Sequence, residues 1–154
     1  MMKKIMNDNL KEKTLKYILY KMRTEKEVRK FLQEKHGAAQ EEVEDIIQYL
    51  YSYNYLDDEK YAEMFVRDKL RFSPVGRIKM SYELSNRGIS SDIISNIVEE
   101  YLYLEKEIEI AKYLLEKKGK LADSTVKKQR YLYSRGFSNS AIARAVKLDE
   151  NNYE

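Results

Sequence analysis

Residue types that could carry catalysis are scarce in this chain. It has no cysteine and a single histidine, His36, beside Gly37. One histidine cannot form a metal cluster by itself, and a partly charged imidazole suits the negative end of a helix dipole. The carboxylates at 41–42 and 57–59 fall where first turns of helices are expected, so we interpret them as caps. Since the sequence also has no GxxxxGK[ST] or GxGxxG motif, it predicts a protein that is not an enzyme and needs no cofactor or metal.

Positively charged side chains are the stronger candidates for function. Residues 111–148 contain ten basic and two acidic side chains. Such a patch could face a filament or phosphates and add salt-dependent affinity, although a solvated helix face would look the same. The candidate partner- or DNA-binding residues are Arg67, Arg71, Arg77, Lys79, Arg87, Lys120, Lys127, Lys128, Arg130, Arg135, Arg144 and Lys147. Reversing Lys127, Lys128 and Arg130 to Glu is expected to weaken binding while leaving the helices intact.

Tyrosine is abundant, with 14 residues. Exposed tyrosines can stack on the bases of a single strand, whereas most tyrosines between helices only pack. Tyr131 and Tyr133 are the two that merit a test, because they lie among the basic residues.

The composition and periodicity predict an all-α chain. There is one proline and five glycines, and apolar residues recur at helical spacing. No apolar run is long enough for a signal peptide or a membrane span, so we expect a soluble, cytoplasmic protein. The predicted inner-face residues are Leu15, Ile18, Leu19 and Met22; Val28, Phe31 and Leu32; Val43, Ile46, Ile47 and Leu50; Tyr61, Ala62, Phe65, Val66 and Leu70; Ile78 and Leu84; Ile93, Ile94, Ile97, Val98 and Tyr101; Ile108, Ala111, Leu114 and Leu115; Val126 and Leu132; and Ile142, Ala145 and Val146.

Capping residues mark where these helices should begin. Thr24 and Glu27 have the spacing of a capping box, and Ser73 precedes the only proline, which suits the first position of a helix. The other predicted caps are Asp57 or Asp58, Ser90 or Ser91, Asp123–Ser124, and Ser138 or Ser140.

The helices recur as an internal repeat. Counted from Gly37, Gly88 and Gly136, positions +6, +9 and +10 are apolar in all three cases. Leu84 and Leu132 stand four residues before their glycines, whereas Leu32 stands five before Gly37. Each unit is too small to fold alone, which predicts an elongated, curved array of three tandem three-helix repeats. The predicted boundaries are a flexible N-terminus (1–9), repeats at 10–56, 57–104 and 105–148, and an acidic tail (149–154).

The middle repeat resembles the RecX family, regulators of the RecA recombinase. The resemblance lies in Leu56–Ala62, Gly76–Ile78, Glu83–Leu84 and Arg87–Ile89. Arg135–Ser138 is similar to the family's third repeat, and 23–28 more loosely to its first. The family usually has Ser and Leu where this chain has Thr24 and Val28. The resemblance implies binding in the groove of the RecA–DNA filament, bridging protomers and slowing ATP hydrolysis and strand exchange.

Three hypotheses remain from the sequence. The first is a monomeric regulator that docks on the RecA filament. The second is a protein that binds single- or double-stranded DNA directly through the basic third repeat, and the third is a helical scaffold with another protein partner. Charge alone does not separate the first two. DNA-dependent ATP hydrolysis by RecA, with this chain titrated in, would do so.

Overall fold

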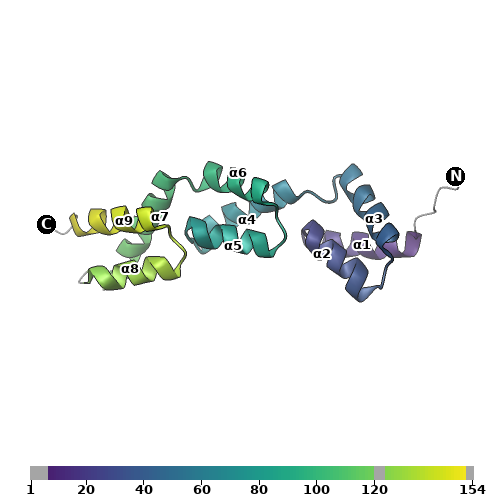
Figure 1. The fold of residues 1–154 in the computed structure, drawn as a ribbon, viewed down its shortest axis with the longest axis horizontal. Helices are drawn as coiled ribbons and strands as arrows, with labels where there is room; N and C mark the ends of the chain where they lie inside the picture. Colours follow the sequence, from purple (N-terminus) through teal and green to yellow (C-terminus); the bar gives the residue numbers. More distant parts are fainter. Residues whose placement is uncertain (1–6, 120–123, 152–154) are drawn as a thin grey trace. The chain divides into compact units, whose positions relative to one another are not determined.

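The structure of the chain, a computed structural model, describes residues 7–119 and 124–151. Every regular element in these two ranges is a helix, which confirms the predicted all-α fold (Figure 1). The helices are α1 (Asp8–Tyr20), α2 (Glu25–Lys30), the π-helix η1 (Phe31–Lys35), α3 (Gln40–Ser52), α4 (Asp58–Phe72), α5 (Arg77–Asn86), α6 (Ser91–Tyr101), α7 (Leu104–Lys118), α8 (Thr125–Ser134) and α9 (Asn139–Asn151). They form two compact units: residues up to Tyr61 with Arg87–Ile89, and Ala62–Asn86 with the residues from Ser90 onward.

The core of the first unit confirms most of the predicted apolar faces. Its buried residues are Leu10, Ile18, Val28, Leu32, Val43, Ile46, Ile47, Leu50 and Leu56. The prediction for the first helix was wrong in register. Because Asn7 caps α1, the helix begins early and buries Leu10 and Ile18, while Leu19 is exposed and Met22 lies beyond the last turn.

A π-helix explains why the first repeat departs from the other two. Five residues, Phe31–Lys35, form one wide turn before the chain reaches Gly37. A π turn holds one more residue than an α turn over the same rise. Leu32 is therefore buried five residues before its glycine, whereas Leu84 and Leu132 are buried four before theirs.

The two aspartates at the start of α4 cap different helices. The Asp57 carboxylate accepts a hydrogen bond from the Lys60 N–H of its own helix, at 3.1 Å. The Asp58 carboxylate instead accepts from the Glu25 N–H at the start of α2, at 3.0 Å, next to the predicted Thr24 cap. Burial raises the pKa of Asp58, and the neighbouring carboxylates add to that rise. Each aspartate therefore satisfies one free N–H group of a helix N-terminus.

One hydrophobic core of the second unit lies between α7, α8 and α9. Ile108, Ala111 and Leu115 pack against Leu132 and the predicted face of α9, with Phe137 filling the turn before it. Ser124 caps α8, accepting from the Lys127 N–H, and Asp123, predicted with it, lies outside the described residues. Ile78 and Val126 were wrongly predicted as core residues, since both are more than half exposed; Met80 is buried in α5 instead.

The segment before α5 is not helical, contrary to the prediction from Ser73–Pro74. The helix begins at Arg77, because the preceding residues pair with the turn between α8 and α9. The Gly76 N–H donates to the Arg135 carbonyl at 2.9 Å, and the Ile78 N–H donates to the Gly136 carbonyl at 3.0 Å. A Cβ atom at Gly76 would collide with the backbone of Phe137, so only glycine fits.

One buried carboxylate also binds where the start of α5 meets the turn between α8 and α9. Glu107 of α7 has no exposed surface, and its Oε2 accepts from the Arg77 N–H at 3.0 Å and from the Ser138 N–H at 2.9 Å. Its Oε1 accepts from the Ser138 hydroxyl at 2.6 Å. The same side chain therefore serves the N-termini of α5 and α9, where the helix dipoles favour negative charge.

Candidate partner-binding surface

The third repeat carries a hollow between its second and third helices. It has a volume of about 480 Å³ and is open to solvent between α8 and α9. The residues that line it are Gln129, Arg130, Tyr133, Asn139, Ile142 and Ala143. Ile142 supplies an apolar floor, while the amides and Arg130 supply polar groups at the rim.

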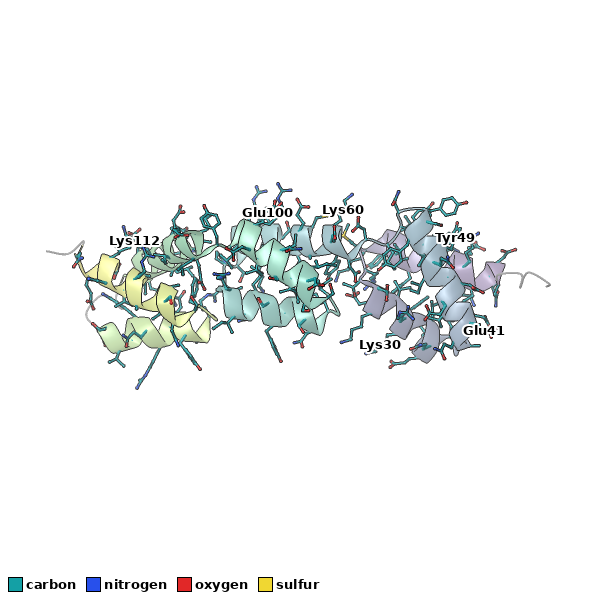
Figure 2. The ribbon with its side chains drawn as sticks, turned by 45° about the horizontal axis from the view of Figure 1, so that its top comes forward. Lys30, Glu41, Tyr49, Lys60, Glu100 and Lys112 are labelled. Atoms are coloured by element: carbon teal, nitrogen blue, oxygen red, sulfur yellow. The ribbon has the colours of Figure 1, made fainter. Side chains whose placement is uncertain are left out.

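Four predicted cations stand exposed on the same two helices. Lys127 and Arg130 lie on α8, and Arg144 and Lys147 lie on α9. None of the four has an ion-pair partner among the described residues. Lys147 follows Ala143 by one helical turn, so it extends the rim of the hollow. Figure 2 shows long side chains projecting outward from α8. This group of four, which we call the α8–α9 cations, consists of the predicted candidates that are exposed on these two helices.

Lys128 does not belong to that surface, contrary to its place in the predicted patch. Its ammonium is buried and lies 3.0 Å from a carboxylate oxygen of Asp149, which is also buried. The repeat could have revealed this. Lys128 stands eight residues before Gly136, as Met80 stands before Gly88, and both positions are buried. The ion pair replaces an apolar core contact.

Three more of the predicted arginines make contacts within the fold. The Arg135 guanidinium donates to the Pro74 carbonyl at 2.6 Å. Arg77 pairs with Glu99 at 2.7 Å, and Arg87 donates to the Tyr61 hydroxyl at 3.1 Å. The pKa of Tyr61 is raised mainly by burial, and Arg87 opposes that rise. These arginines therefore hold turns and helix ends in place.

The remaining candidates are scattered. Lys79 is half-buried beside Gly136, and Arg67 pairs with Glu63 at 3.4 Å. Arg71 is exposed, with its guanidinium 5.2 Å from the ring centre of Phe72. Lys120 lies outside the described residues. None of the three described candidates, Lys79, Arg67 and Arg71, lines the α8–α9 hollow.

The two tyrosines singled out from the sequence differ. Tyr133 lines the hollow and is 70% exposed, so its ring is accessible to a partner. Tyr131 packs against the α7–α9 core, with the Lys118 ammonium 5.1 Å from its ring centre. Only Tyr133 fits the expected stacking role.

Groups suited to catalysis do not gather in the described residues. His36 lies with its ring edge against Phe31, 4.6 Å between ring centres, as a structural histidine would. Within residues 7–119 and 124–151, no three His, Asp or Glu side chains lie close enough to hold a metal ion. None of the helices described has both the length and the apolar surface needed to cross a bilayer.

Comparisons with known proteins give consistent matches. The family description "RecX, second three-helix domain" matches residues 57–96. A "Regulatory protein RecX" from Caldanaerobacter subterraneus subsp. tengcongensis is 34% identical over 128 residues, which cover 83% of this chain and 64% of that relative. Another from Clostridium perfringens (strain SM101) is 36% identical over 152 residues, covering 92% of this chain and 69% of that relative. The chain thus spans about two thirds of the length of these two relatives.

A solved structure has the same fold. The crystal structure of RecX from Lactobacillus salivarius superposes with a TM-score of 0.85, covering 94% of this chain and 96% of that one. The two sequences are 24% identical, so this likeness concerns the fold alone.

Proposed function

The chain belongs to the RecX family of regulatory proteins, and from that membership we propose that it binds the RecA–DNA filament and modulates, mainly inhibits, its ATP hydrolysis and strand exchange. The relatives that support this are named as regulators, and the proposed role is accordingly not that of an enzyme. The chain would act by occupying the filament rather than by chemistry of its own.

The observation that best supports this proposal is the set of α8–α9 cations. Four exposed positive charges, with no ion-pair partner in the described part of the chain, lie on the two helices that form the hollow, and Arg130 lines it. A nucleoprotein filament offers phosphates and acidic side chains, and both would gain from such a surface. Because exposed charges act at long range, they would also speed association at low salt.

DNA-dependent ATP hydrolysis by RecA tests the proposal. We expect this chain, titrated in at sub-stoichiometric amounts, to slow hydrolysis on single-stranded DNA, because one bound molecule can affect several neighbouring protomers. Hydrolysis that is unchanged even at an excess of this chain would rule the proposal out.

Direct DNA binding through the third repeat is the second candidate. It is favoured by Tyr133, which is exposed beside Arg130 in the same hollow, because an aromatic ring next to a cation suits a single strand. Binding to bare DNA would support it if the salt dependence of the affinity corresponds to the release of several ions. Binding that requires RecA would exclude it.

We also propose a localisation, an oligomeric state and repeat boundaries for the chain. We propose a cytoplasmic, monomeric protein with three-helix repeats at 10–56, 57–104 and 105–148. The predicted flexible N-terminus (1–9) and acidic tail (149–154) were drawn too long, because α1 begins at Asp8 and α9 runs to Asn151 with Asp149 buried. Chromatography with light scattering would measure the oligomeric state.

A further inference from the structure

The second repeat has a hollow of its own between α5 and α6, in the same compact unit as α8 and α9. Its volume is about 750 Å³. It is lined by Arg77, Ile78, Ser81, Tyr82, Ser85, Ser91, Ile94, Ser95, Val98, Glu99 and Ser138. Of the predicted site residues, Arg77 alone lines it.

The two hollows are built from equivalent residues. Counted from Gly88 and from Gly136, every one of the six residues around the α8–α9 hollow has its counterpart in the α5–α6 hollow. The pairs are Ser81 with Gln129, Tyr82 with Arg130, Ser85 with Tyr133, Ser91 with Asn139, Ile94 with Ile142, and Ser95 with Ala143. The fold therefore places the same concave surface on both repeats, while the side chains give each a different chemistry.

The two hollows also adjoin. Ser138 lines the hollow of the second repeat, and Asn139, the next residue, lines that of the third. Glu107 fixes this point, because it binds both the Ser138 N–H and the Arg77 N–H. The two hollows are therefore next to each other at the start of α9, which is close enough for one extended ligand to reach both.

The two hollows differ in charge and polarity. The α8–α9 end carries unpaired positive charge. The α5–α6 end has five serines and the exposed apolar side chains of Ile78 (58%) and Tyr82 (65%), and its one arginine, Arg77, is paired with Glu99. Phosphates would find no unpaired cation there, but an exposed isoleucine beside a tyrosine suits apolar side chains of a protein.

We infer that the two hollows form one docking track for a single linear segment of a protein partner, acidic where it lies on α8–α9 and uncharged and apolar where it lies on α5–α6. We assign the acidic part of the segment from its charge complementarity to the α8–α9 cations. We assign its apolar part from the exposed side chains of Ile78 and Tyr82. The inference rests on the proposed function in that RecA is the partner used to test it.

Photocrosslinking from both ends of the track tests the inference. The photoreactive p-benzoylphenylalanine is introduced in place of Tyr82, Tyr133 or, as a control, Tyr113, which is exposed on α7 and lines neither hollow. Each variant is mixed with RecA filaments on single-stranded DNA, irradiated and analysed by mass spectrometry. We expect the probes at positions 82 and 133 to label one continuous RecA segment, with its acidic part at 133, and the control probe to label that segment at least tenfold less.

Other labelling patterns would overturn the inference. Labelling of the DNA from both positions would make the occupant a nucleic acid. Labelling of two RecA segments far apart in sequence would mean two sites rather than one track. A segment labelled from Tyr113 as strongly as from the track would place the contact elsewhere. If the unsubstituted chain does not co-sediment with filaments, the proposed function itself fails, which distinguishes the two failures.

A synthetic peptide of the labelled segment then separates the two ends. We expect Arg130→Glu to weaken its binding about tenfold at low salt, and less in high salt. Tyr82→Ser should weaken binding to a similar extent at every salt concentration, because an apolar contact is not screened. Equal salt dependence of the two effects would contradict the assignment of an acidic and an apolar end.

Discussion

At the residue scale, Glu107 is a buried side chain that caps two helices of the second unit. Its two oxygens accept three hydrogen bonds, two of them from helix N-termini. Hydrogen bonds to a buried carboxylate are stronger than neutral ones. The sequence offered a signal for its burial, because Glu107 stands four residues before Ala111, on the predicted inner face. We interpreted acidic residues near helix starts only as local caps, and so overlooked a cap that acts on two other helices.

Glu107→Gln is expected to destabilise the second unit by about 2–3 kcal/mol, because an amide places N–H groups where the carboxylate accepts. Chemical unfolding followed by circular dichroism would measure this loss. Hydrogen exchange should speed up at the amides of Arg77 and Ser138 in particular. Glu105→Gln, the same change at an exposed position of α7, serves as the control. Equal stability of the two variants would contradict the role assigned to Glu107.

The pair of Lys128 and Asp149 shows a second residue-scale effect. Removing one partner leaves a buried charge uncompensated, so Lys128→Met should cost about 3–5 kcal/mol of unfolding free energy. The double variant Lys128→Met with Asp149→Leu should recover most of that loss. Lys127→Met, at the exposed neighbour, is the control and should stay within about 0.5 kcal/mol. A double variant as unstable as the single one would show that the ion pair is not the cause.

At the element scale, the repeats are joined by a recurring device. A carboxylate from α4, Asp58, binds the first turn of α2, and one from α7, Glu107, binds the first turn of α5. In each case the acceptor stands near the start of the first helix of a repeat, and the donor at the start of the second helix of the preceding one. The apolar periodicity predicted the helices well, since burial follows local spacing. It could not show that Pro74–Gly76 would pair with the turn at Arg135–Phe137, because 61 residues separate these partners.

The raised pKa of Asp58 makes one of these contacts depend on pH. A carboxyl whose pKa is higher in the folded state stabilises that state most below its unfolded pKa, near 4, and the contribution is lost as the pH rises through the folded value. Asp58→Asn keeps an acceptor oxygen without the charge. Relative to the natural chain, this variant should therefore gain a few tenths of a kcal/mol between pH 3.5 and pH 7. Hydrogen exchange at the Glu25 amide would measure the gain, and parallel pH profiles of the two proteins would contradict it.

At the scale of the whole molecule, the proposed function depends on which positive charges are exposed and have no partner among the described residues. The sequence located the excess of positive charge in the third repeat but treated every cation there as equivalent. The structure separates them, because Lys128 is buried and Arg135 binds a carbonyl, whereas Lys127 and Arg130 are exposed and pair with none of the described carboxylates. The periodicity of the sequence could have assigned Lys128 to the core. Only the tertiary contacts of Arg135 show that it is not a candidate for binding a partner.

Charge reversal at Lys127 and Arg130 tests whether the α8–α9 cations contribute to inhibition. Lys128 is left unchanged, because reversal there would disrupt the core. The double variant to Glu should weaken inhibition of RecA about tenfold or more at low salt, and circular dichroism should show unchanged helicity. Lys13→Glu with Lys21→Glu, two exposed lysines in or beside α1, makes the same change in net charge. If this control loses as much inhibition, the effect comes from net charge rather than from the α8–α9 cations.

The π-helix in the first repeat has a consequence for comparing the repeats with one another. Its extra residue lies inside a helix, not in a connecting loop where insertions usually accumulate. An alignment of the three repeats therefore needs its gap within Phe31–Lys35. With the gap there, Val28 falls in the same column as Met80 and Lys128, and Glu25 in the same column as Arg77. Deleting one residue from that turn would convert the first repeat to the register of the other two.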